Sequence, residues 1–175
     1  MIAFTLSKPD LALARWIGRE RNAAKAGIPS RKYATTKATD EEIHVLGAKA
    51  EIAVARVLGV EPDRNFYRHG DGGVDLRVGG YTVDVKMRST PYTDLLIQPD
   101  LSDFRADCII LCWPWGTGEN TVAVIGLVTR KRFVEKATFL HLASPRLVVR
   151  WSDLTPIGEP VQRPLAQISY GALYG

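Results

Sequence analysis

Three ionisable residues in one short stretch, GDGGVDLRVGGYTVDVKMRS (residues 70–89), have types and spacings that could do chemistry together with a divalent cation. Asp75 and Asp84 supply carboxylate oxygens, which are the ligands that Mg²⁺ and Mn²⁺ prefer. Lys86 follows Asp84 by two residues, so its positive charge projects on the same side of the strand. The first question is therefore which elements hold these side chains and whether they meet.

A β-hairpin is predicted around these residues. Gly79-Gly80 separates two β-forming runs and is a typical two-residue turn. With this turn Val78 lies opposite Tyr81, and Asp75 lies opposite Asp84. Because side chains alternate along a strand, one face carries only apolar residues and should pack on a core. The other face carries Asp75, Arg77, Thr82, Asp84, Lys86 and Arg88.

Two carboxylates directly opposed in this hairpin would repel each other. Their Cβ atoms would be roughly 4.5–5.5 Å apart, and like charges at that distance destabilise a strand pair. A divalent cation between them would reverse the sign of the effect. The alternatives are a solvated polar face whose charges are balanced by Arg77 and Lys86, or a slipped register.

Glu51 is a second unusual acid. It lies beside the apolar stripe of an expected helix, in GAKAEIAVARVLG. The positions three and four residues away carry no basic residue, so the usual salt bridge within a helix is excluded. An acid without a partner near a core is costly, so we expect Glu51 to meet a cation.

The order Glu51, Val74-Asp75, Asp84-Val85-Lys86 resembles the PD-(D/E)XK nuclease superfamily over residues 40–130. That family has a Glu on its first core helix, an Asp on its second strand and a D/E-X-K triplet on its third. Val74 replaces the proline of the nominal motif, and residues 89–105 match less well, since the family usually has a helix there.

This resemblance implies a metal-dependent DNA nuclease with Mg²⁺ or Mn²⁺ as cofactor. Asp75 and Asp84 would be the main metal ligands, with the Val85 carbonyl contributing and Glu51 binding directly or through water. Lys86 would orient the attacking water and offset the phosphate charge. The residues expected to hold backbone phosphates of DNA are Arg77, Arg88, Arg15, Arg19 and Lys25.

Charge is unevenly distributed along the chain. Residues 1–40 hold eight Lys and Arg against three acidic residues, whereas the whole chain has a net charge of +4. A basic segment suggests an anionic partner, of which nucleic acid is the commonest. The alternative is a solvated basic helix face.

The remaining pattern predicts an α/β fold, specifically a restriction-endonuclease-like mixed β-sheet flanked by helices. Capping signals predict helices over residues 8–25 and 40–58, and a short helix from residue 130. Strands are expected at 65–69, in the hairpin, at 106–113, at 121–129 and at 146–151, while residues 89–105 fit no clear element. We expect one domain, with a basic helical extension (1–38), a core (39–152) and a Pro/Gly-rich tail (153–175).

Composition is that of a globular protein, with 46% hydrophobic and 24% charged residues in 175. No apolar run reaches the ~20 residues of a membrane span, and the N-terminus lacks the layout of a secretory signal, so a cytoplasmic location is expected. Cys108 and Cys112 fall on one face of a strand, and we expect two buried free thiols rather than a disulfide or a zinc site.

Several functions remain open at this point. A nuclease of this kind could cut junctions, act like a restriction enzyme or degrade ends, and junction cutting would need a homodimer. The alternatives are a non-catalytic nucleic-acid-binding module on the same fold and a small-molecule metal hydrolase. Gln98 could assist the site or be a solvated amide. Trp113 and Trp115 could stack on bases, form a dimer contact or pack internally.

Overall fold

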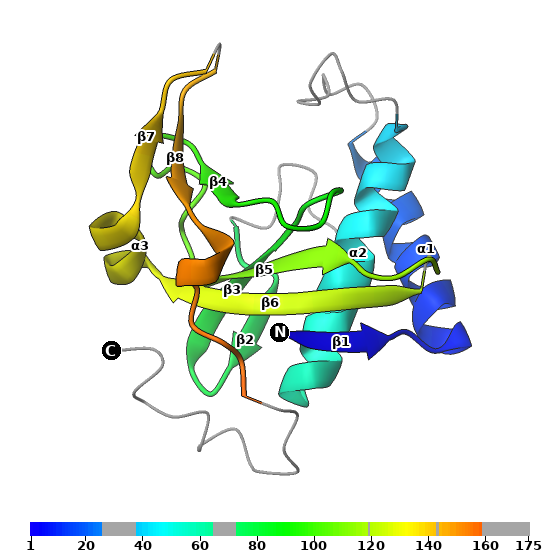
Figure 1. Cartoon of the computed structure of the whole chain (residues 1–175). Helices are drawn as coiled ribbons and strands as arrows, with labels where there is room; N and C mark the ends of the chain where they lie inside the picture. Colours follow the sequence, from blue (N-terminus) through cyan, green and yellow to red (C-terminus); the bar gives the residue numbers. More distant parts are fainter. Residues whose placement is uncertain (26–37, 65–72, 119, 143, 159–175) are drawn as a thin grey trace.

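The computed structural model describes residues 1–25, 38–64, 73–118, 120–142 and 144–158. It is an α/β structure with a five-stranded mixed sheet and a second, three-stranded antiparallel sheet (Figure 1). The α/β class and the mixed sheet agree with the sequence prediction.

Two long helices form one layer. At the start of α1 (Lys8–Ala24) the Ser7 hydroxyl accepts a hydrogen bond from the Asp10 amide, and the Asp10 carboxylate accepts one from the Ser7 amide. In α2 (Asp40–Leu58) Thr39 and Glu42 make the same reciprocal pair. Gly59 ends α2 in the left-handed region with φ 68°, which glycine adopts without steric cost. Both helix starts are therefore confirmed.

The main sheet has the strand order β1-β6-β5-β3-β2. Its strands are β1 (Ile2–Thr5), β2 (Leu76–Val78), β3 (Tyr81–Met87), β5 (Cys108–Pro114) and β6 (Thr121–Thr129). The predicted hairpin register is confirmed, since Val78 pairs with Tyr81 and Leu76 with Val83. β3 and β5 run parallel, whereas the other neighbouring strands are antiparallel.

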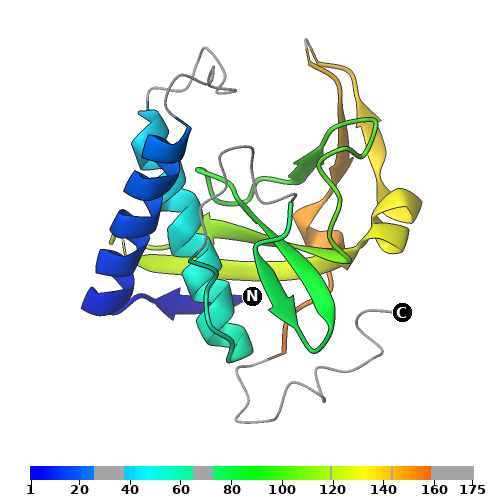
Figure 2. The same ribbon diagram turned by 180° about the vertical axis from the view of Figure 1, so that it is seen from behind.

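A smaller sheet of order β4-β8-β7 stands beside the main one, at the upper left of Figure 1. It consists of β4 (Leu95–Ile97), β7 (Thr138–Leu140) and β8 (Arg146–Val149). The short helix α3 (Arg130–Lys136) leads into β7, and a 3₁₀ turn, η1 (Trp151–Asp153), follows β8. Seen from behind, the small sheet again lies away from the two long helices (Figure 2).

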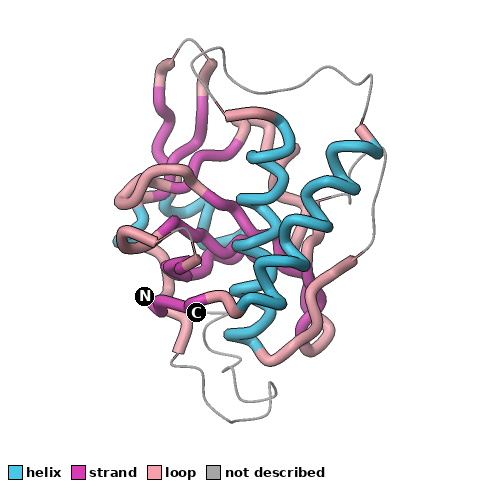
Figure 3. Tube along the Cα trace, turned by 90° about the vertical axis from the view of Figure 1, so that its right-hand side faces the viewer, coloured by secondary structure: helices cyan, strands magenta, loops and turns pink. Residues whose placement is uncertain are grey.

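The two faces of the main sheet bury two separate cores. Val83 and Val85 of β3 belong to the core shared with α1 and α2. Ile109 and Leu111 of β5 belong to a second core with β4, β8 and α3. The helices thus form a layer against one face, as Figure 3 shows, and the small sheet covers the other.

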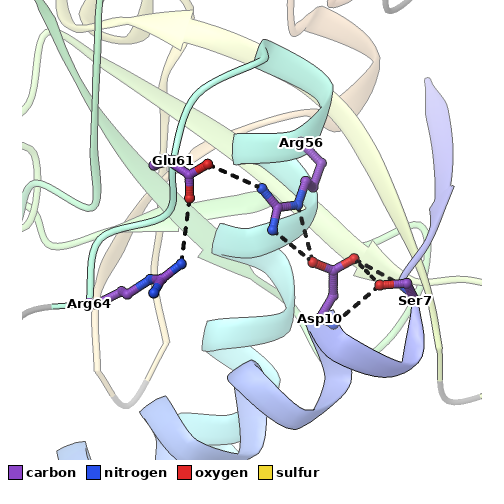
Figure 4. A network of polar contacts seen from close by, with 5 residues as sticks. All are labelled: Ser7, Asp10, Arg56, Glu61 and Arg64. Atoms are coloured by element: carbon purple, nitrogen blue, oxygen red, sulfur yellow. Dashed lines mark hydrogen bonds and ion pairs between the residues drawn. The ribbon is translucent and has the colours of Figure 1, made fainter.

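One end of the helix layer is held by a polar network (Figure 4). Asp10 is 7% exposed and accepts hydrogen bonds from Arg56 Nε (3.1 Å) and Nη2 (3.0 Å), as well as from Ser7. Arg56 also reaches Glu61 (3.8 Å), which pairs with Arg64 (3.6 Å). The capping acid of α1 therefore fastens it to the last turn of α2.

Some of the other elements predicted from the sequence are confirmed, and others are not. Strands β5, β6 and β8 and helix α3 are confirmed, and Cys108 and Cys112 are free and buried. The expected strand at 65–69 and most of the tail lie outside the described residues. β4, and not a helix, occupies the segment between β3 and β5. In the described part of the chain, no helix is both long and apolar enough to cross a bilayer.

The N-terminal segment is part of the core structure. β1 pairs with β6 over residues Ile2 to Thr5, and α1 packs along α2. Leu11, Ala14 and Ile17 of α1 are buried in the same core as Val83 and Val85. The expected boundary between a basic extension and the core therefore does not correspond to a structural division.

Candidate active site

Asp84 and Lys86 form an ion pair on β3. The Asp84 Oδ2 and Lys86 Nζ atoms are 2.8 Å apart. In the parallel register their neighbours on β5 are Ile109 and Leu111, which belong to the second core, so both side chains project from the face opposite the long helices. Asp84 is 2% exposed, whereas about a third of the Lys86 side chain (35%) is exposed. The pair therefore joins a buried carboxylate to a cation that reaches solvent.

The pKa of Lys86 is raised by its surroundings. Burial of the ammonium acts in the opposite direction, but the charge of Asp84 and its hydrogen bond outweigh burial, and Asp75 adds to them. Lys86 is therefore charged throughout the neutral range. The charges of Asp75 and Asp103 act in the same direction as that of Asp84 on this ammonium.

Asp75 joins this group in a way that the simple hairpin does not predict. The paired ladder begins at Leu76, so Asp75 is not a directly opposed partner of Asp84. Its amide donates to the Val83 carbonyl (2.9 Å), and its Oδ2 accepts from the Val85 amide (2.6 Å). The Asp75 carboxylate thus accepts the hydrogen bond that a backbone carbonyl beside β3 would otherwise accept from Val85. The prediction that Asp75 and Asp84 lie directly opposite each other is therefore wrong.

Glu51 has a different role from the one expected. Arg21 of α1 donates two hydrogen bonds to its carboxylate, from Nη1 to Oε1 at 2.6 Å and from Nη2 to Oε2 at 2.7 Å. The cation that Glu51 was expected to meet is thus the guanidinium of Arg21, which comes from the neighbouring helix and not from the helix of Glu51 itself. Glu51 is 6% exposed, on a helix that packs against the face carrying Val83 and Val85. Because side chains alternate along β3, Asp84 and Lys86 project from the opposite face of the sheet.

These donors fit a small divalent cation only in part. In the described ranges, no three His, Cys, Asp or Glu side chains gather as a metal cluster. Mg²⁺, however, is commonly held by one or two carboxylates, with water and substrate phosphate completing its coordination. Asp75 and Asp84 fit that requirement, with the Val85 carbonyl as a further oxygen on the same strand. Glu51, held at both oxygens by Arg21, does not fit.

The basic residues expected to hold phosphates divide between two layers. Arg77 is exposed on β2 opposite Thr82, on the same hairpin face as Asp84. Arg88 is half-buried directly after β3, and its amide continues the ladder by donating to the Cys112 carbonyl (3.0 Å).

The other three belong to the helix layer on the far side of the sheet. Arg15 is exposed on α1, and Arg19 pairs with Glu41 at 3.3 Å. Lys25 is the C-cap residue of α1. The pKa of His44 is lowered mainly by burial of its imidazole and next by the positive charge of Lys25. These residues are not neighbours of Lys86.

An aromatic cluster near the end of β3 was only partly foreseen. Trp113 is 1% exposed, and its ring lies 5.3 Å from that of Tyr92 and 5.5 Å from that of Trp151. Trp115 lies 6.2 Å from Tyr92. The sequence pointed to the two tryptophans of β5 and its loop, but not to Tyr92 or Trp151. Tyr92 directly follows a proline, and this position next to a turn was the available signal.

Two further polar contacts were also missed or differently assigned. The Asp107 carboxylate accepts from the Thr82 amide and hydroxyl, both at 2.7 Å, which lowers the pKa of Asp107 and fastens β3 to the start of β5. Gln98 accepts from the buried Arg146 at 3.0 Å. Gln98 thus supports β8, and it is not a solvated loop amide.

Comparisons with protein-family models, with curated proteins and with solved structures found no match to this chain.

Proposed function

We propose that this protein is a Mg²⁺- or Mn²⁺-dependent nuclease that hydrolyses phosphodiester bonds in DNA. One observation carries the proposal: a buried carboxylate, Asp84, is paired with the partly exposed Lys86, and Asp75 adds its charge to the same ammonium. Buried charges are costly, and a buried ionisable group with a specific charged partner is common at functional sites.

Each residue has a defined task in this proposal. Asp75 and Asp84 would hold the cation, which when bound lowers the pKa of water and stabilises negative charge on phosphate. Lys86, kept protonated by its acidic neighbours, would bind a phosphate oxygen and orient the attacking water. The Val85 amide fixes the Asp75 carboxylate, so that this ligand needs no reorganisation when substrate arrives.

The strand arrangement supports the resemblance to PD-(D/E)XK nucleases. An antiparallel hairpin carries Asp75 near one strand and the Asp84-Val85-Lys86 triplet on the next, and the following long strand, β5, is parallel to the triplet strand. Two departures count against the full family site. Glu51 is held by Arg21, and β4 replaces the helix after the triplet strand.

A non-catalytic nucleic-acid-binding module is the second candidate. The Arg21–Glu51 pair favours it, because the helical acid that would complete the family's acidic set is neutralised. In that case Asp84 would serve only to position Lys86.

The deciding experiment incubates the protein with plasmid, linear duplex, single-stranded and four-way-junction DNA. Each substrate is tested with Mg²⁺, with Mn²⁺ and with EDTA. We expect cleavage of at least one substrate that depends on the metal. Asp84→Asn and Lys86→Met should each reduce the rate by at least about a hundredfold, as removal of one electrostatic group in an active site does.

The control is Arg77→Gln, which removes an exposed charge on the same hairpin without touching the ion pair. It should weaken binding slightly and leave the maximal rate within a few-fold. Metal-independent cleavage, or an Asp84→Asn protein that is folded and fully active, would refute the nuclease proposal. DNA binding without any cleavage would establish the binding module instead.

A further inference from the structure

The exposed ring of Tyr92 lies on a group of three tryptophans just beyond the carboxyl end of β3. Tyr92 is 63% exposed, and its ring centroid lies 5.3 Å from Trp113, 6.2 Å from Trp115 and 6.1 Å from Trp151. The contacts are tilted or edge-on, with interplanar angles of 54° to 67°. A large apolar ring is thus held by its neighbours while most of it stays in water.

The backbone at Tyr92 is also unusual. Its φ is 59°, in the left-handed region that bulky residues rarely adopt and that costs of order 1 kcal/mol or more. The position follows Pro91 in a turn closed by a hydrogen bond from Thr93 Oγ1 to the Thr90 carbonyl (2.7 Å). Glycine or asparagine is the favoured residue after proline when φ is positive. A tyrosine here adds strain and exposed apolar area together, which packing alone does not explain.

This aromatic group continues the row of side chains that forms the candidate active site. Asp84 is in register with Ile109, Lys86 with Leu111, and the next β5 residue on that face is Trp113. Two residues along a strand span about 7 Å. Tyr92 follows β3 and Trp115 follows β5, so the cluster lies at the carboxyl ends of two parallel strands, where α/β proteins commonly bind ligands.

Two cations lie at this end of β3, together with one acid beside the rings, Asp94, whose carboxylate accepts from the Trp151 amide at 2.9 Å. Lys86 is about a third exposed, and Arg88, at the same end of β3, has no acidic partner among the described residues. The Trp113 ring is held in place by a hydrogen bond that its Nε1 donates to the Thr93 carbonyl at 3.2 Å. An aromatic platform beside cations is the combination that single-stranded nucleic acids bind, with bases on the rings and phosphates on the cations.

We propose that Tyr92, supported by Trp113, Trp115 and Trp151, stacks on an unpaired base next to the phosphate that Lys86 binds. The inference rests on the proposed function for the identity of the polymer and sharpens it. The preferred substrate has a single-stranded or flipped nucleotide at the cutting position, because a base inside an intact duplex does not expose its face to Tyr92.

The test measures binding in EDTA, where no cleavage occurs. Fluorescence anisotropy compares a fluorescein-labelled dT₁₂ with an abasic oligonucleotide of the same length and charge. The wild-type protein should bind dT₁₂ more tightly by about tenfold, the contribution of roughly one stacked base. Tyr92→Gly should remove that difference and leave binding of the abasic strand unchanged.

Tyr92→Gly also separates stacking from packing. Glycine relieves the backbone strain at φ 59° but gives up the ring contacts with the tryptophans, so the variant should stay folded with a melting temperature close to that of the wild type. Tyr92→Phe should keep both binding and stability. The matched control is Phe139→Ala, which removes another exposed ring (48%) from β7 in the small sheet and should change neither affinity.

Three results would overturn the inference: equal wild-type affinity for the two oligonucleotides, unchanged dT₁₂ binding by Tyr92→Gly, or an equal loss in Phe139→Ala. Failure of the nuclease proposal gives a different pattern. Base-dependent binding would then persist in EDTA while no DNA is cut with Mg²⁺ or Mn²⁺.

Discussion

The helix layer and the β3 face both bury acidic side chains, but they satisfy them differently. Glu51 and Asp10 each accept two hydrogen bonds from one arginine, and both arginines come from the other long helix. Asp84 is paired with a lysine of its own strand, two residues away, whose side chain is about a third exposed. Bidentate arginine contacts fix geometry, whereas an ammonium is a mobile point charge. The helix pairs therefore stabilise the fold, and the strand pair is suited to exchange its contacts with a substrate.

Breaking the Arg21–Glu51 pair should give the largest loss of stability. Arg21→Met leaves the Glu51 carboxylate buried without its partner, and such a change typically costs about 3–5 kcal/mol. Urea denaturation at neutral pH measures the free energy of unfolding. The double variant Arg21→Met/Glu51→Leu should recover most of the loss, because no charge remains buried.

A loss below about 1 kcal/mol in Arg21→Met would contradict the assignment of this pair to the fold.

The Arg21–Glu51 pair also shows what could and could not be predicted from the sequence. Local signals were sufficient for the caps Ser7 and Thr39, for the stop at Gly59 and for the Gly79-Gly80 register, because neighbours in the chain set each of them. The partner of Glu51 lies thirty residues away on another helix. Spacing within one helix therefore cannot reveal it.

The same limit applies to the short strands and to Asp75. β1, β4 and β7 have only three or four residues each, and their pairing with distant strands, rather than their own pattern, defines them. Alternation correctly placed Asp84 and Lys86 on one face. It could not show that the ladder begins at Leu76, and so it misplaced Asp75 as a directly opposed residue.

The Asp10 network should give an intermediate effect that depends on pH. Burial of Asp10 acts to raise its pKa, but hydrogen bonds from Ser7 and Arg56 and the charge of Arg56 together lower it below its ordinary value of 3.8. A lowered pKa means that the charged form contributes stability above the unfolded value, and that this contribution is lost as pH falls through the folded value.

Asp10→Asn should therefore cost about 2 kcal/mol at pH 7, from loss of a charged cap and of the Arg56 pair. The difference from wild type should shrink as pH falls below 4, in thermal melts at a series of pH values. A difference that stays constant down to pH 2 would show that Asp10 is not charged in the folded protein. Glu42→Gln, at the equivalent capping position of the exposed α2 start, should show a smaller effect.

The Asp84–Lys86 pair should give the smallest effect on stability, with an asymmetry. Lys86→Met leaves the Asp84 carboxylate without its partner, but because the Lys86 side chain is about a third exposed, water can replace the ammonium, and the cost should be about 1 kcal/mol. Asp84→Asn leaves an ammonium that can turn toward water, so its cost should be smaller still. Urea denaturation of both variants tests this order, and the reverse order would show that Asp84, like Glu51, mainly maintains the fold.

Direct binding of Mn²⁺ tests the central claim, that the functional acids are Asp75 and Asp84 and that Glu51 is not among them. Electron paramagnetic resonance reports free Mn²⁺ during titration of wild type, Asp84→Asn, Asp75→Asn and Glu51→Gln, each confirmed as folded by circular dichroism. The account predicts that wild type and Glu51→Gln bind Mn²⁺ with similar affinity, whereas the two aspartate variants lose at least about tenfold, as removal of a charged ligand implies. Absence of binding by the wild type at millimolar Mn²⁺, or loss of binding in Glu51→Gln with retention in Asp84→Asn, would contradict it.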